Sequence, residues 1–173
     1  LKQSHPDLFP LAILYRINSQ SLALESEFLK QRIHFRILKG LRFFERKEIR
    51  DALSLLRLAL NPADDLAFLR EVEFLPLGIG SKTLASLQAL AREKSLPLVT
   101  ALEQCLADKF NSRPLFSRLR ELNRQKDEMP VAEIFSRLLQ ESGYLDALRE
   151  KEEEERLLNI GELREFIGKW EEE

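Results

Sequence analysis

The spacing of apolar residues changes part-way along this chain, and the change separates two predicted structural classes. Residues 11 to 17 form a compact apolar run, and residues 33 to 37 alternate apolar with other side chains before Gly40 interrupts them. Both stretches are typical of β-strands, and the amphipathic residues between them predict a helix that continues to Lys30. The beginning of the chain is therefore predicted to alternate strand, helix and strand.

From Glu45 onward the apolar residues follow the helical period. Four apolar residues from Ile49 to Leu60 advance by four, three and four positions, which places them on one face of a helix that Asn61-Pro62 would end. No strand pattern returns beyond that point. The later signals are helix starts at Asp64 or Asp65, at Ser81 or Thr83, at Pro97 and after Met129-Pro130, and a helix stop at Gly143.

The last predicted helix starts in an acidic run and then carries an apolar stripe. Such a stripe needs a partner surface, because the apolar face of a helix is buried in a folded protein. Its members are Leu157, Ile160, Leu163, Ile167 and Trp170.

These patterns predict an α/β fragment followed by an all-α helical subdomain, in a chain that is mostly helical overall. The period changes at Asn61 to Asp65, so the predicted domains are residues 1–60 and residues 61–173. We expect no β-sheet in the second domain.

The composition is that of a globular protein that we expect in the cytoplasm. Of 173 residues, 44% are apolar and 32% are charged. No apolar run reaches the roughly 20 residues of a membrane span, and the start of the chain lacks the apolar core of a signal peptide. The single cysteine, Cys105, allows no internal disulfide, and its apolar neighbours predict a buried thiol.

Charge is distributed unevenly along the chain. Residues 1–60 contain eleven Lys and Arg and six Asp and Glu, a net charge of +5. The remaining residues contain sixteen Lys and Arg and twenty-three Asp and Glu, a net charge of −7. A cationic first part could bind phosphate groups. The alternative is an ordinary solvated surface, with Glu45, Glu48 and Asp51 as partial ion-pair partners of the cations.

Tyr15 and Arg16 are the first candidates for chemistry, because they stand together at the end of a predicted strand. Tyr can stack on a flat base, and Arg can pair bidentately with phosphate oxygens. On residue type alone, the same pair also fits a purely structural strand end.

The run from Leu41 to Asp51 gathers aromatic and cationic side chains near a helix start. Adjacent phenylalanines offer a stacking surface and the cations can contact phosphates, a composition that suits single-stranded DNA. The alternative is that one phenylalanine fills the core while Arg46 pairs with Glu25 or Asp51. The candidate DNA contacts are Arg42, Phe44, Arg46 and Lys47.

A further candidate is the loop Gly78-Ile79-Gly80, directly before a predicted helix start. Two glycines around an apolar residue can make a tight turn whose backbone N–H groups point outward, a geometry that binds a phosphate without reading bases. The candidate DNA contacts here are Gly78, Ile79, Gly80, Lys82 and Thr83.

Taken together, these segments resemble the UvrD/PcrA/Rep group of superfamily 1 DNA helicases. Ser142-Gly143-Tyr144 and the pattern Arg156-x-x-Asn159-x-x-Glu162-Leu163 extend the resemblance towards the end of the chain. The polar members of that pattern fall three apart on one helix face, and we expect them to tie neighbouring helices together through hydrogen bonds. The other matching segments are Ala12 to Ser21, Leu41 to Asp51, Leu55 to Leu58, Asn61-Pro62 and Pro76 to Leu84.

The resemblance implies a place for each part of the chain in a helicase. Residues 1–60 would be the first part of the second RecA-like motor domain, called 2A, and residues 61–173 the leading part of the helical 2B subdomain. Tyr15 is then expected to stack on the adenine of ATP. Arg16 is expected to reach the γ-phosphate across the cleft between the motor domains, as an arginine finger does. The loop that begins at Gly78 is expected to touch duplex DNA ahead of the fork.

The implied function is part of an ATP-dependent 3′-to-5′ DNA helicase and translocase, with ATP and Mg²⁺ as cofactors of the intact parent enzyme. The expected partners are single-stranded and forked DNA, the other helicase domains of the parent chain, and repair or replication proteins. The sequence has no Gly-x-x-x-x-Gly-Lys-Ser/Thr phosphate loop, so we expect no ATP hydrolysis from this chain alone. A non-enzymatic helical module that binds nucleic acid or a protein partner is the alternative.

Overall fold

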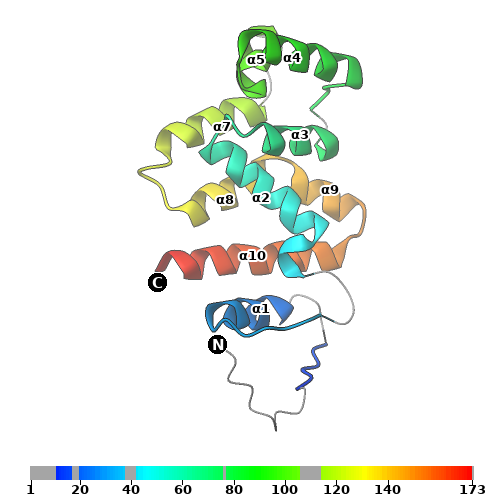
Figure 1. The fold of residues 1–173 in the computed structure, drawn as a ribbon, viewed down its shortest axis with the longest axis vertical. Helices are drawn as coiled ribbons and strands as arrows, with labels where there is room; N and C mark the ends of the chain where they lie inside the picture. The colour runs from blue at the N-terminus through cyan, green and yellow to red at the C-terminus, as the bar shows by residue number, and fades with distance from the viewer. Residues whose placement is uncertain (1–10, 17–19, 38–41, 76, 106–113, 173) are drawn as a thin grey trace. The chain divides into compact units, whose positions relative to one another are not determined.

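The computed structural model describes residues 11–16, 20–37, 42–75, 77–105 and 114–172, and this part of the chain is mostly helical, as predicted. It divides into two compact units, residues 1–43 and residues 44–173. No helix in the described ranges is both long enough and apolar enough to cross a membrane. The helices are α1 (Ser21–Lys30), the short 3₁₀ helix η2 (Phe43–Glu45), α2 (Lys47–Leu60), α3 (Asp65–Phe74), α4 (Ser81–Lys94), α5 (Leu98–Cys105), α7 (Pro114–Gln125), α8 (Val131–Glu141), α9 (Tyr144–Glu150) and α10 (Glu154–Glu172) (Figure 1).

In the first unit, the chain after α1 is held against that helix. The rings of Phe28 and Phe35 pack with their centroids 5.3 Å apart. Glu25, buried on α1, accepts hydrogen bonds from the backbone N–H of Phe43, with 3.0 Å to each carboxylate oxygen. These contacts join α1 to the chain that follows it, as far as Phe43, which lies 18 positions after Glu25.

The described part of this unit contains no β-strand, so the predicted α/β fragment is not shown by the structure. Residues 11–16 and 33–37 form neither a helix nor a strand, and Leu11 and Leu14 are 87% and 95% exposed. A strand needs backbone hydrogen bonds to a neighbouring strand. The alternating pattern favours an extended backbone and does not specify that neighbour. The predicted strand end at Gly40 lies outside the described residues.

In the second unit, α2 is the central helix, in contact with α3, α7, α8 and α10 (Figure 1). Its apolar side chains are buried around most of its circumference, and Ile49 and Leu55 are fully enclosed. The helix ends at Leu60, where Pro62 follows Asn61, so the helix predicted from this pattern is confirmed.

Local signals set several other helix ends in this unit. The side chain of Asp64 caps α3 by accepting a hydrogen bond from the Ala67 backbone N–H at 2.9 Å. The predicted start at Ser81 is the first residue of α4. Gly143, with φ of 74°, adopts the left-handed conformation that favours glycine and separates α8 from α9. These predicted starts and the predicted stop are confirmed.

Cys105 is exposed, which corrects the predicted buried thiol. It is the last residue of α5, whose buried residues are Leu98, Val99, Ala101 and Leu102. Cysteine is usually a buried residue, but the buried residues of α5 lie in its earlier turns and Cys105 lies at its exposed end.

The apolar stripe of α10 packs on earlier helices of the same chain. Its members from Ile160 to Ile167 are buried, and α10 contacts α2, α8 and α9. The partner surface that the stripe needs is therefore supplied within the second unit. Trp170, the last member of the stripe, is 65% exposed. The next residue, Glu171, accepts a hydrogen bond from the backbone N–H of Val131 at the start of α8.

The compact units divide earlier than the predicted domains. α2 precedes the predicted boundary at Asn61 to Asp65, yet it packs with the helices of the second unit. Tertiary contacts define a compact unit, whereas the change of apolar period marks a change of secondary structure. The assignment of residues 1–60 and 61–173 to two helicase subdomains stays a prediction.

Candidate functional site

Tyr15 and Arg16 end the segment of residues 11–16 that precedes α1. The Arg16 side chain is exposed and the Tyr15 side chain is half-buried. The backbone N–H of Arg16 donates a hydrogen bond to Oε1 of Gln20 at 3.1 Å. A partly accessible ring beside an exposed guanidinium can contact a flat base and a phosphate from the same side.

The run predicted to contact DNA is divided between the two units. Arg42, in the first unit, is exposed, and its guanidinium lies 5.5 Å from the centroid of the Phe35 ring. Phe43 is fully buried, so one phenylalanine of the pair fills the core, as the structural alternative predicted. Phe44 begins the second unit, where its half-buried ring packs edge-on against Phe166 with centroids 5.8 Å apart.

Arg46 and Lys47 stand at the start of α2, and their side chains differ in exposure. Arg46 is 8% exposed, and its Nη1 donates a hydrogen bond to Oδ1 of Asn159 on α10 at 2.9 Å. The Lys47 side chain is 60% exposed, and its Nζ lies 5.7 Å from the centroid of the Phe74 ring. Arg46 therefore joins two helices, whereas Lys47 is accessible from solvent.

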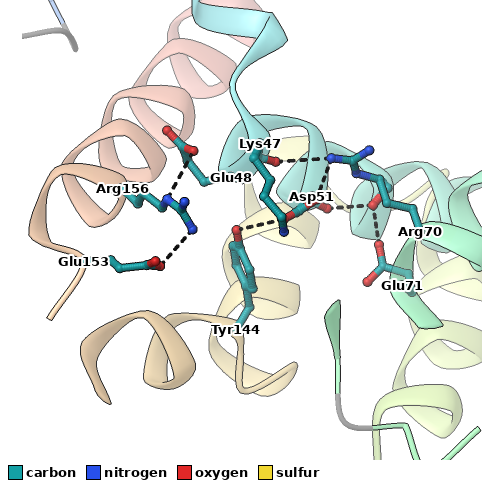
Figure 2. Close-up of polar contacts among 9 residues, drawn as sticks. Lys47, Glu48, Asp51, Arg70, Glu71, Tyr144, Glu153 and Arg156 are labelled. Atoms are coloured by element: carbon teal, nitrogen blue, oxygen red, sulfur yellow. Dashed lines mark hydrogen bonds and ion pairs between the residues drawn. The ribbon is translucent and has the colours of Figure 1, made fainter. Parts of the chain in front are cut away.

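A buried carboxylate lies beneath Lys47. Asp51 of α2 is 2% exposed and pairs with Nζ of Lys47 and with Nη2 of Arg70 from α3, both at 2.7 Å (Figure 2). The hydroxyl of Tyr144 from α9 donates to the same carboxylate at 3.5 Å. Burial and the negative charge of Asp51 raise the pKa of Tyr144. We call these four residues the Asp51 cluster, and they join three helices.

A second polar contact joins α2 to α10. The side-chain amide of Asn159 donates a hydrogen bond to Oε1 of buried Glu48 at 2.7 Å and accepts the one from Arg46. Arg156 lies with its Nε 3.8 Å from Oε2 of Glu48 and donates to Glu153 at 3.0 Å (Figure 2). The predicted hydrogen bonds between neighbouring helices are confirmed for Asn159, whereas Arg156 reaches α2 through an ion pair with Glu48. Glu162, the third residue of that pattern, is half-buried.

Glu71 of α3 is a buried carboxyl group beside the Asp51 cluster. The Ser54 hydroxyl lies 2.8 Å from the backbone oxygen of Asp51 and 2.5 Å from Oε1 of Glu71. Burial, together with the negative charge of Asp51, raises the pKa of Glu71 to about 8. A hydroxyl carries one proton, so a protonated Glu71 satisfies both contacts by donating to Ser54 while Ser54 donates to the backbone oxygen. Burial and this hydrogen-bond arrangement both favour the protonated form of the Glu71 carboxyl.

In the loop before α4, one of the two glycines adopts a left-handed backbone conformation. Gly78 has φ of 59°, in the region that favours glycine, and its neighbour Ile79 is 8% exposed. Gly80 is exposed and precedes the first residue of α4, where backbone N–H groups lack partners within the helix. Beyond it, Lys82 is exposed and Thr83 is half-buried. The loop can therefore present N–H groups and one cation to an anion.

The profile of the family described as UvrD-like helicase C-terminal domain matches residues 1–172 of this chain. The chain belongs to that family. The UvrD-like domain is 36% identical over 163 residues to DNA helicase II of Escherichia coli, which covers 90% of this chain and 23% of the relative. It is 33% identical over 164 residues to the ATP-dependent DNA helicase PcrA of Staphylococcus epidermidis. The aligned region covers 91% of this chain and 22% of the relative.

The ATP-dependent DNA helicase PcrA of Bacillus subtilis is 31% identical to the UvrD-like domain over 167 residues, 93% of this chain and 23% of the relative. The chain thus spans less than a quarter of the length of these curated relatives. These similarities confirm the family that the sequence motifs predicted.

Sequence reasoning missed the Asp51 cluster and Glu71 as a connected group in this UvrD-like domain. A signal was present in α2, because Asp51 and Ser54 fall among the apolar residues of a helix that is buried almost all round. Polar residues in such positions need buried partners. Their partners Arg70 and Tyr144 lie 19 and 93 positions away from Asp51, so the sequence pattern could not identify them.

Proposed function

We propose that this chain is part of an ATP-dependent DNA helicase that moves 3′ to 5′ along one strand and unwinds the duplex ahead of it. The observation that carries this proposal is the family match, which extends over residues 1–172. Residues 1–60 contribute the start of the 2A motor domain, and residues 61–173 contribute the leading part of the 2B subdomain.

The chain supplies two residues to the ATP site of the parent enzyme. ATP with Mg²⁺ provides the phosphoryl group whose transfer to water drives the motor. Tyr15 stacks on the adenine, and Arg16 places its guanidinium at the γ-phosphate. The exposure of Arg16 and the partial exposure of Tyr15 support this assignment, because both side chains are open to a ligand.

Single-stranded DNA contacts cationic and aromatic residues that belong to both compact units. Arg42 and Lys47 contact phosphates, since both side chains are exposed. Phe44 supplies a partly accessible ring for base stacking. Arg46 stabilises the start of α2 through its hydrogen bond to Asn159 on α10.

Duplex DNA ahead of the fork binds the loop before α4. Backbone N–H groups around Gly78, Ile79 and Gly80 hold a phosphate, and Lys82 and Thr83 add a cation and a hydroxyl at the start of the helix. Such contacts do not depend on base sequence. This loop therefore positions the duplex and does not select a site on it.

Hydrolysis of ATP by the full-length parent enzyme tests the assignment of Arg16. The Arg16→Ala variant should lose turnover by a factor on the order of 10³ with a modest loss of ATP affinity, because a finger arginine stabilises the transferring phosphate. Arg92→Ala, which removes an exposed arginine of α4, is the matched control and should keep normal turnover. An unaffected rate in the Arg16 variant would refute the assignment.

A further inference from the structure

A cavity of about 370 Å³ opens between α8, α9 and α10, and it is lined by none of the residues assigned above to ATP or DNA. Its volume lies in the range of roughly 300–1,000 Å³ that is usual for ligand sites. The floor is apolar and two arginines stand among its lining residues. The floor residues are Leu139, Leu145, Leu157 and Ile160, and the arginines are Arg149 and Arg164.

Gly161 leaves the cavity open on the side of α10. It lies inside that helix and lines the cavity, and a Cβ built on it would meet no atom within 4 Å. Glycine weakens a helix interior relative to alanine. Since no neighbour within the fold requires the small residue there, the space above Gly161 is available to an external group.

The arginines of the cavity come from different helices and can act together. Arg149 of α9 pairs with Asp146 at 2.7 Å, but these side chains are 62% and 68% exposed, so the ion pair is weak and exchangeable. Arg164 of α10 is exposed. Guanidinium groups above an apolar floor fit a carboxylate that neighbours an apolar side chain.

The acidic residues around the cavity favour a peptide over a nucleic acid. Asp146 lines the cavity, and exposed Glu150 and Glu165 are the chain neighbours of the two arginines. A polyanion that extends past the cavity would meet these carboxylates, whereas a short peptide with one or two acidic residues would meet the arginines.

We propose that this cavity binds a short acidic segment of a partner protein, with one apolar side chain on the floor and its carboxylates paired to Arg149 and Arg164. The cavity is then a protein-interaction site on the second unit. It uses none of the residues through which the domain is proposed to contact DNA or ATP.

Selection from a random displayed peptide library against the purified chain tests this inference. Enriched peptides should carry Asp or Glu next to Leu, Ile, Met or Phe. A fluorescently labelled peptide of the enriched sequence should then bind at least about tenfold more weakly to the Arg149→Gln/Arg164→Gln double variant, because both charge-assisted contacts are lost.

Two glycine variants separate a blocked cavity from a damaged fold. Gly161→Leu fills the cavity with a strong helix-forming residue, so it should weaken peptide binding by at least about tenfold while helix content and thermal stability are maintained. Gly168→Ala is the matched control in α10, since a Cβ there also meets nothing within 4 Å and the residue does not line the cavity. It should bind the peptide as the natural chain does.

Several results would overturn the inference. They are no enrichment, enrichment of basic or uncharged peptides, and equal binding by the Gly161→Leu variant. A different outcome is that an oligothymidylate displaces the labelled peptide from the natural chain and fails to bind the arginine double variant. That result would assign the cavity to nucleic acid.

Discussion

The pH dependence of stability should be set in large part by Glu71, and the Glu71→Gln variant isolates its contribution. The folded protein holds this carboxyl neutral, with a pKa of about 8 against an ordinary value of 4.5. Between these values the folded state binds a proton that the unfolded state has released. The free energy of unfolding contributed by Glu71 is therefore greatest below about pH 4.5, falls as the pH rises to about 8, and is constant above that.

The magnitude follows from the same pKa values. One unit of pKa corresponds to about 1.4 kcal/mol, so the full change is on the order of 5 kcal/mol, with a slope of about 1.4 kcal/mol per pH unit inside the window. This is a large share of the roughly 5–15 kcal/mol by which a domain is stable. Glutamine cannot ionise, and its amide can donate to Ser54 as the protonated carboxyl does.

Urea unfolding followed by circular dichroism at several pH values from 5 to 9 measures the effect. The natural chain and the Glu71→Gln variant should have similar stability near pH 5, and the variant should be more stable by several kcal/mol, on the order of the full change, near pH 9. Glu73→Gln, which changes an exposed carboxylate of the same helix, is the matched control and should follow the natural chain. Parallel pH profiles of the natural chain and the Glu71 variant would refute the reasoning.

Three other changes test the remaining assignments. An Arg42→Ala/Lys47→Ala double variant of the parent enzyme should bind forked DNA more weakly with a shallower dependence on salt, by fluorescence anisotropy, and an unchanged salt slope would make these residues structural. Asn159→Ala should lower stability to urea by on the order of 3 kcal/mol, because it removes a hydrogen bond from each of two buried charged side chains, and a negligible loss would contradict that role. In thermal melts, Gly143→Ala should destabilise by about 1–2 kcal/mol because of its positive φ, whereas Gly168→Ala should stabilise by up to about 1 kcal/mol; equal melting temperatures would refute this.

Local signals in the sequence were sufficient to predict most helices of the second unit. Pro62 ends α2 because proline has no N–H to continue the ladder, and Asp64 caps α3 because its short side chain reaches a free N–H one turn ahead. Gly143 separates α8 from α9 because its conformation strains any residue with a Cβ. Each of these effects acts within four residues, so no knowledge of the rest of the fold is required.

The same local reasoning was insufficient for the first unit. Residues 33–37 have the alternating pattern of a strand but form none, since pairing depends on a neighbour that lies elsewhere in the chain. Phe43 and Phe44 are adjacent and chemically identical, yet Phe43 is fully buried and Phe44 is half-buried. The choice between them depends on which elements pack against each ring.

The family, the helical character of the second unit and the set of candidate contacts were predictable from the amino-acid sequence, because motifs and the helical period are properties of neighbouring residues. The tertiary structure decided which candidates are accessible: it directs Arg46 towards Asn159 and leaves Lys47 exposed. It also raises the pKa of Glu71, because the packing of α2 on α3 buries this carboxyl and brings Asp51 beside it. Accessibility and ionisation depend on contacts between residues far apart in the chain, and those contacts exist only in the folded protein.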